Sequence, residues 1–119
     1  MEVIIDGIVY VPKQEDAKVK VEPVVLEEHY KFEVHAENLG DMNWNDAVEA
    51  VEKLGDGWRL PTIEECFIMY RHKLITEAYY WSSTEYVNFY AWIFYFGSGY
   101  AYSNGSKDDT YYVRAVRSI

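Results

Sequence analysis

The last third of the chain carries the side chains best suited to molecular recognition. Nine of the twelve tyrosines lie between residues 79 and 117, interleaved with Ser, Asn, Asp and Gly. Antibody combining loops use this composition because a tyrosine ring gives a large contact area at low side-chain entropy cost, while Ser and Asn adapt their hydrogen bonds to the target. The stretch therefore predicts a binding surface.

Residue types that support catalysis or metal binding form no usable pattern. His29, His35 and His72 lack metal-ligand spacing such as H-E-x-x-H, and neither a Ser-His-Asp nor a paired-carboxylate arrangement is recognisable. Cys66 is the single cysteine, so it cannot form an internal disulfide, and we expect it to act as a small buried hydrophobe. The sequence predicts no catalytic residue, no cofactor and no metal site.

The charge distribution restricts the classes of partner. The formal net charge is -9, with 14 acidic and 5 basic side chains in residues 1–58 and 6 of each in residues 59–119. Nucleic-acid binders need a basic stripe that displaces counterions from phosphates, and none is present. No apolar run is long enough to span a bilayer, and the N-terminus lacks the basic and apolar regions of a signal peptide. We expect neither nucleic-acid binding nor membrane insertion. The location is left open between a virion, the cytoplasm before assembly, and a cell surface that is reached through partners.

The first 23 residues are predicted to form a hairpin and an arm. Residues 3–11 are two β-rich runs around Asp6-Gly7, a dipeptide that suits a two-residue hairpin turn. Residues 12–23 are polar and bounded by prolines, as is typical of a linker. This arm is a candidate contact with another subunit, a virion or a surface partner.

Residues 24–119 are predicted to form one α+β domain. Strand-like alternation at residues 30–34 precedes a helix that Asn43 caps and Gly55 ends. A second helix begins at Thr62, where Thr62 and Glu65 match a capping box, and its expected apolar stripe is Ile63, Cys66, Phe67 and Tyr70. Strands are expected at residues 80–83, 91–96, 100–102 and 111–117.

Residues 91–96, AWIFYF, alternate with the period of a strand. We expect Trp92, Phe94 and Phe96 to face the core, and Ile93 and Tyr95 to face outward. Tyr100 and Tyr102 would lie on the same outer side. The alternative is an aromatic-rich sheet with scattered exposed tyrosines.

Residues 57–62, GWRLPT, favour a structural role. Trp58 and Leu60 are expected to fill the core between helices and sheet. Arg59, Arg114 and Arg117 are expected to pair with acidic groups such as Glu64, Glu65 or Glu85, although exposed pairs contribute only ~0–1 kcal/mol each.

Four stretches of the chain form a recognisable series, in the order WNDAVEAVEKLGDGWRLPTIEEC, YYWSSTEY, AWIFYF and YYVRAVR. The series resembles the bacterial and phage domain known as DUF1566, the C-terminal domain of lectin-like adhesins, over roughly residues 32–119. The resemblance implies a C-type lectin-like fold related to formylglycine-generating enzymes. Together with the expected elements, it predicts two helices packed on a small twisted antiparallel sheet, with an N-terminal β-hairpin.

A narrower resemblance is to variable proteins of diversity-generating retroelements. In those proteins the retroelement mutates adenines in the codons of a segment that forms the C-terminal strands and loops of this fold. Mutation of adenines in Asn-type codons cannot produce Lys, Glu, Gln, Met or Trp. From Ile93 to Tyr111 the chain contains only one residue of these types, Lys107. Residues with the character of fixed positions are Trp92, Phe94, Phe96, Gly97, Gly99, Gly105 and Lys107. The predicted ligand-binding residues are Tyr86, Asn88, Tyr90, Ile93, Tyr95, Ser98, Tyr100, Tyr102, Ser103, Asn104, Ser106, Asp108, Asp109 and Tyr111.

Trp44-Asn45-Asp46 also matches the calcium motif of animal C-type lectins, but here it opens an expected helix. Calcium needs about six to eight converging oxygens, more than Asn45 and Asp46 supply. We expect these two to be helix-capping and surface residues, and Asp108 and Asp109 to lie in a solvated loop.

The predicted function is therefore non-enzymatic binding of a protein or glycan receptor on a cell surface by a diversified, tyrosine-rich face. The setting would be a phage, a prophage or a bacterial surface. Alternatives are a fixed-specificity lectin-like adhesin, a structural virion subunit that uses this face to form a homo-oligomer, and an enzyme of the formylglycine-generating type. The last would need a pair of cysteines and copper.

Overall fold

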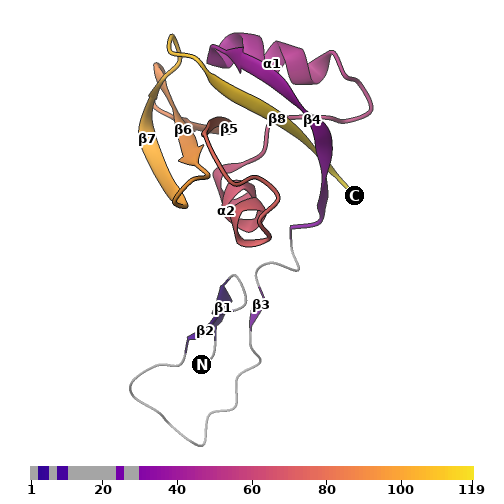
Figure 1. Cartoon of the computed structure of the whole chain (residues 1–119), viewed down its shortest axis with the longest axis vertical. Coiled ribbons are helices and arrows are strands. Elements are labelled where there is room, and N and C mark those ends of the chain that lie inside the picture. Colours follow the sequence, from indigo (N-terminus) through magenta and orange to yellow (C-terminus); the bar gives the residue numbers. More distant parts are fainter. Residues whose placement is uncertain (1–2, 6–7, 11–23, 26–29) are drawn as a thin grey trace, which may run out of the picture. The chain divides into compact units, whose positions relative to one another are not determined.

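The structure is a computed structural model of the 119-residue chain, and it describes residues 3–5, 8–10, 24–25 and 30–119 (Figure 1). The chain divides into two units, residues 1–31 and 32–119. In the first, β1 (Val3–Ile5) pairs antiparallel with β2 (Ile8–Tyr10) and parallel with β3 (Val24–Val25). Both strands of the expected hairpin are present, while Asp6, Gly7 and residues 12–23 lie outside the described residues.

The second unit is built on a five-stranded sheet of order β4-β8-β5-β6-β7. Its strands are β4 (Phe32–Met42), β5 (Tyr79–Tyr86), β6 (Tyr90–Tyr95), β7 (Tyr100–Ser106) and β8 (Tyr111–Ser118). The pairing of β5 with β8 is parallel and the other three are antiparallel, so the sheet is mixed and the expectation of an antiparallel sheet is correct only in part. The parallel pair arises because the C-terminal strand β8 lies between β4 and β5, antiparallel to β4 and parallel to β5.

The first predicted helix is confirmed as α1 (Trp44–Glu52). The side chain of Asn43 caps it by accepting a hydrogen bond from the backbone N–H of Asp46 at 2.9 Å. The chain leaves the helix through Gly55, whose φ of 71° is readily available only to glycine. Ala47 and Val51 form the buried side of α1.

The second predicted helix and its capping box are confirmed in α2 (Ile63–Arg71). Arg59 donates from both terminal nitrogens to Glu65, at 2.7 and 2.8 Å, and Glu65 also accepts from the backbone N–H of Thr62 at 2.8 Å. Burial alone would raise the pKa of Glu65, but the hydrogen bonds from Arg59 and Thr62 outweigh it and hold the pKa below its ordinary value. The pair links the end of the α1–α2 connection to the first turn of α2.

The expected apolar stripe of α2 is correct only in part. Cys66 is fully buried, but the helix buries Ile68 and Met69 where the prediction placed Phe67 and Tyr70. Phe67 and Tyr70 contact the ring of Phe94, with centroids 4.9 and 5.8 Å apart, and remain partly exposed. These two rings therefore lie at the boundary of the core.

The two helices cover opposite faces of the sheet. On the α1 side the core includes Val51, Trp81, Ile93 and Val113, and on the α2 side it includes Cys66, Met69, Tyr80, Phe94 and Val116. Neighbours in one strand, such as Tyr80 and Trp81, therefore enter different cores. No helix among the described residues has the length and apolar character needed to cross a membrane.

The predicted outward position of Ile93 is wrong, because the side chain is only 4% exposed. The prediction assumed one covered face, whereas β6 lies inside the sheet and is buried on both faces. Trp92, predicted to lie in the core, is half-buried. Register shifts between Trp81 and Glu85 in the β5–β6 pair and between Ala91 and Ile93 in the β6–β7 pair interrupt the simple alternation at this point.

The residues of the GWRLPT motif and their partners differ in burial. Leu60 is buried as predicted, but Trp58 is half-buried between the ring of His35 and the guanidinium of Arg117. Arg117 forms the expected kind of ion pair, with Glu33. Arg114 instead donates to the backbone carbonyl oxygen of His35 at 3.2 Å.

Candidate ligand-binding face

Tyrosines from four neighbouring strands gather on the α1 side of the sheet, in the part that α1 leaves bare. We call this group the tyrosine face: Tyr79, Tyr95, Tyr100, Tyr102 and Tyr111. The strand register places Tyr79 opposite Tyr95, and Tyr95 opposite Tyr100. Tyr79, Tyr95 and Tyr111 each lie two residues from a residue of the α1-side core, which fixes the side on which they project.

The ring of Tyr79 lies at the centre of the tyrosine face. It stacks on Tyr95, with centroids 4.4 Å apart and ring planes inclined by 25°, and contacts Tyr102 and Tyr111 at 6.2 and 6.0 Å. Tyr100 continues the series through Tyr102 at 6.5 Å and is 61% exposed. The rings support one another, so the face presents ordered aromatic surface to the solvent.

The turn between β6 and β7 is shaped around two aromatic rings. A Cβ atom on Gly97 would lie 2.5 Å from Cζ of Tyr95, and one on Gly99 would lie 2.5 Å from Cε2 of Tyr70. Gly99 also has a φ of 81°. A side chain at residue 97 would therefore have to displace the ring of Tyr95, and at residue 99 the positive φ favours glycine as well.

Gly105 lies over the boundary between the tyrosine face and the core. Its Cβ would meet Cγ2 of Ile93 at 2.7 Å and the carbonyl oxygen of Ala91 at 2.8 Å. Both atoms belong to buried residues that cannot move freely. Space, rather than backbone conformation, therefore requires glycine here.

Tyr111 connects the tyrosine face to an acidic turn. Its ring packs edge-on against Trp81, with centroids 4.8 Å apart. Burial raises the pKa of Tyr111 above its ordinary value, and the negative charge and hydrogen bond of Asp109 raise it further. One edge of the face therefore carries a negative potential.

A second exposed group occupies the turn between β5 and β6. We call it the hairpin tip: Tyr86, Val87, Asn88, Phe89 and Tyr90. All five are exposed, Phe89 most of all at 75%. The β5–β6 register pairs Tyr86 with Tyr90 at this end and Tyr79 with Tyr95 at the other. The structure therefore does not bring the predicted ligand-binding residues Tyr86, Asn88 and Tyr90 together with the tyrosine face.

Lys107 anchors the hairpin tip. Its Nζ lies 2.6 Å from Glu85 and donates to the carbonyl oxygen of Asn88 at 3.0 Å, while its backbone N–H donates to the carbonyl oxygen of Phe89 at 2.9 Å. The same ammonium lies 4.3 Å from the ring centre of Trp44. Lys107, the one residue between Ile93 and Tyr111 that adenine mutation could not produce, thus connects three segments of the chain.

The remaining predicted residues surround these two groups. Ser98 is exposed in the β6–β7 turn, Asn104 is exposed on β7, and Ser103 and Ser106 are half-buried on the same strand. Asp108 and Asp109 are exposed in the β7–β8 turn, as predicted.

Sequence reasoning missed Tyr79 and Phe89 as candidate site residues. Tyr79 precedes the predicted strand at 80–83 by one residue, and its alternation with Trp81 was a usable signal. Phe89 was passed over although it lies between two residues that were selected. Within the described part of the chain, no group of three or more His, Cys, Asp or Glu side chains could hold a metal ion.

Comparison with known proteins identifies one family. The family model described as the Lcl C-terminal domain matches residues 27–117, a range that includes both helices and almost the whole five-stranded sheet. No curated protein matches the chain.

Proposed function

We propose that this chain, which belongs to the Lcl C-terminal domain family, is a non-catalytic protein that binds its target through the tyrosine face. The family assignment makes residues 27–117 a lectin-like domain of the DUF1566 type. The observation that carries the proposal is the exposed ring cluster around Tyr79.

Contiguous exposed aromatic surface is uncommon on a monomer unless it binds something. A cluster whose rings already contact one another has lost much of its side-chain freedom before a ligand arrives, so less entropy is lost on binding. Tyrosine also offers a hydroxyl beside each ring, which suits both protein and glycan targets.

We propose a receptor on a cell surface as the target, and a phage, prophage or bacterial surface as the setting. In this proposal the scaffold is C-type lectin-like. Exposed positions of the face would vary by retroelement mutagenesis, whereas Gly97, Gly99, Gly105 and Lys107 would stay constant. The support is that a Cβ atom at each of the three glycines would overlap a neighbouring residue, and that another side chain at residue 107 would lose the contacts of the Lys107 ammonium. Ile93 leaves the proposed variable set because it lies in the core.

A non-catalytic role is supported by the environment of Cys66. The side chain is fully buried, and this burial raises the pKa of the thiol far above its ordinary value. A protonated thiol is a poor nucleophile and a poor metal ligand. Copper-dependent oxygen consumption by the full chain would contradict this part of the proposal.

Binding can be tested with a pair of matched tyrosines. Tyr102 is 38% exposed on the tyrosine face, and Tyr112 is 39% exposed on the other side of the same sheet, against Tyr80. The full chain would be labelled and applied to glycan arrays and to bacterial cells of several strains. We expect Tyr102→Ala to abolish binding to whichever surface the wild type selects, and Tyr112→Ala to retain it. Equal losses in both variants would show that binding does not depend on the tyrosine face.

The diversification proposal needs a separate measurement. We would sequence the 3′ end of this gene in many genomes of one lineage. Substitutions confined to adenine-derived codons, at positions such as Tyr95, Tyr100 and Tyr102, would support retroelement mutagenesis. An invariant segment would favour a fixed-specificity adhesin or a virion subunit.

A further inference from the structure

The hairpin tip is an apolar knob that is held in a strained conformation. Val87 has a φ of 52°, in the left-handed region that a β-branched residue seldom occupies. Val87 and Phe89 are 63% and 75% exposed. Strain and exposed apolar surface both cost stability, and strained residues cluster where function requires them.

The tip is also well anchored. Lys107 holds the carbonyl oxygens of both Asn88 and Phe89, and its side chain is only 14% exposed. A rigid knob loses little conformational freedom when it enters a pocket. The tip therefore has the properties of a preformed contact.

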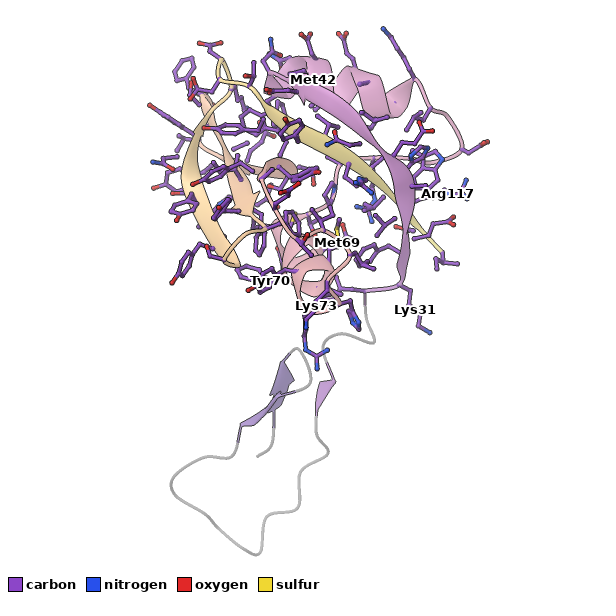
Figure 2. The ribbon with its side chains drawn as sticks, in the orientation of Figure 1. Lys31, Met42, Met69, Tyr70, Lys73 and Arg117 are labelled. Atoms are coloured by element: carbon purple, nitrogen blue, oxygen red, sulfur yellow. The ribbon has the colours of Figure 1, made fainter. Side chains whose placement is uncertain are left out.

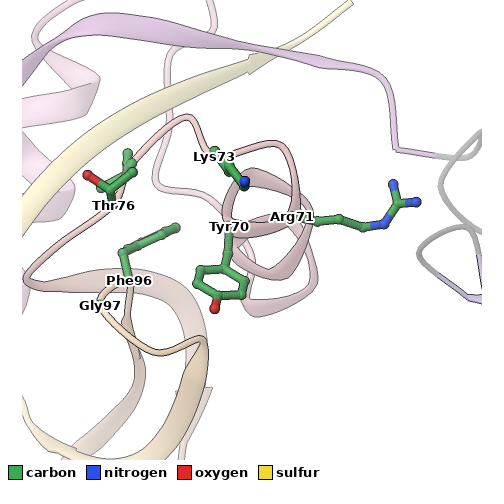
Figure 3. A pocket seen from close by; sticks show the side chains of 7 residues that line it. Tyr70, Arg71, Lys73, Thr76, Phe96 and Gly97 are labelled. Carbon is green, nitrogen blue, oxygen red and sulfur yellow. The ribbon is translucent and has the colours of Figure 1, made fainter.

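A pocket of about 300 Å³ lies between the end of α2 and the β6–β7 turn (Figure 3). Tyr70, Ile75 and Phe96 form its apolar part, and Thr76 and Lys73 are exposed where it opens. Lys73 extends toward the ring of Tyr70, whereas Arg71 points away from it (Figure 3). Its volume is at the lower end of pockets that hold small organic groups, which suits one aromatic side chain.

The tip and the pocket carry charges of opposite sign. At the tip, Lys107 pairs with Glu85, and the neighbouring Asp108 and Asp109 are exposed. The pocket is lined by Arg71 and Lys73.

Tip and pocket lie too far apart to meet within one molecule. The tip joins β5 to β6, and the pocket includes Phe96 and Gly97 immediately beyond the other end of β6. Lys107 also ties the tip to Trp44, which comes two residues after Met42, and Figure 2 shows Met42 and Tyr70 at opposite ends of the second unit.

We propose that the hairpin tip of one copy enters the pocket of a second copy, with Phe89 against Tyr70, Ile75 and Phe96. The contact is head-to-tail, so it builds rings or open chains rather than closed pairs. It uses neither the tyrosine face nor residues 1–23. Successive copies would present several tyrosine faces together, which raises avidity for a surface without new contacts.

The test is sedimentation velocity of the full chain from about 1 µM to about 1 mM, a range that covers weak association. We expect the wild type to associate as concentration rises. Phe89→Ser removes the knob, and Thr76→Glu places a carboxylate at the pocket, where it repels the acidic surroundings of the tip. Each variant should raise the dissociation constant by at least about tenfold, as loss of a central aromatic contact does. Lys73→Glu is a second pocket variant, and Tyr102→Ala is the control that should associate like the wild type.

Mixing the two deficient variants tests the head-to-tail arrangement directly. Phe89→Ser keeps an intact pocket and Thr76→Glu keeps an intact tip, so one intact contact forms only in the mixture. We expect each variant alone to be monomeric and the mixture to stop at a dimer. A wild type that stays monomeric to about 1 mM overturns the proposal. The proposal is also overturned if Phe89→Ser weakens association and Thr76→Glu does not. It is overturned as well if the two variants are folded but form no dimer when mixed. Because Tyr102→Ala tests target binding separately, either proposal can fail alone.

Discussion

The α1 side of the sheet has two halves that share strands and differ in what covers them. In the covered half, Trp81, Ile93 and Val113 are almost completely buried with α1. Two residues along the same strands, Tyr95 and Tyr111 both contact Tyr79, and the three rings are partly exposed to solvent. The comparison shows that the tyrosine face is an extension of the core: each of these rings is positioned by a buried residue one pleat away.

The largest effect is expected from a substitution in the covered half. Trp81→Ala should lower the free energy of unfolding by about 3–5 kcal/mol, because it empties a fully buried site and removes the hydrogen bond from Nε1 to the carbonyl oxygen of Met42. Chemical denaturation would measure the loss. A change below about 1 kcal/mol would show that Trp81 does not support the face.

The boundary between the halves should be nearly as sensitive. Gly105→Ala should cost about 1–3 kcal/mol, because the new methyl group must displace Ile93 or the backbone of Ala91. Ser103→Ala, on the same strand, is the control and should stay within about 0.5 kcal/mol. Equal melting temperatures for the two variants would mean that the boundary is not tightly packed.

In the bare half the effects should be smaller. Tyr95→Ala should cost about 0.5–1.5 kcal/mol, because it removes the stacking partner of Tyr79. Tyr95→Phe should keep most of this stability, since the ring remains. If the phenylalanine variant lost as much as the alanine variant, the hydroxyl rather than the stacking would hold the pair.

The smallest expected effect concerns ionisation at the edge of the face. The pKa of Tyr111 is raised, so its contribution to stability is present below the unfolded value of about 10 and is lost as pH rises through the raised folded value. Asp109→Asn should bring the pKa of Tyr111 down toward that ordinary value. Absorbance titration of tyrosinate, with Tyr111→Phe to assign the signal, would measure the shift. An unchanged titration would remove Asp109 as a cause.

The local elements were predictable because their signals are short-range. Asn43, Thr62 and Glu65 are capping residues with fixed positions relative to a helix start, and each makes the predicted contact. The family resemblance rested on motifs of the same kind, and the matched range of residues 27–117 agrees with it.

The relative placement of strands and helices that are far apart in the sequence was harder to predict. Alternation alone assigns Ile93 to a face, but whether a second helix covers that face depends on the path from β4 to β5. The entry of β8 between those strands, and with it the parallel pair at Tyr80 and Tyr112, likewise has no local signal. For the same reason the predicted site residues formed one group in sequence and two in space.

The anchor at Lys107 has a consequence for how the surface tolerates change. Its hydrogen bonds at the tip go to the backbone oxygens of Asn88 and Phe89, and every amino acid supplies those oxygens. The path of the loop is therefore set independently of the side chains that it displays. Substitutions at residues 88 and 89 would therefore change the exposed side chains, and with them any contact that these side chains make, while leaving the path of the loop unchanged.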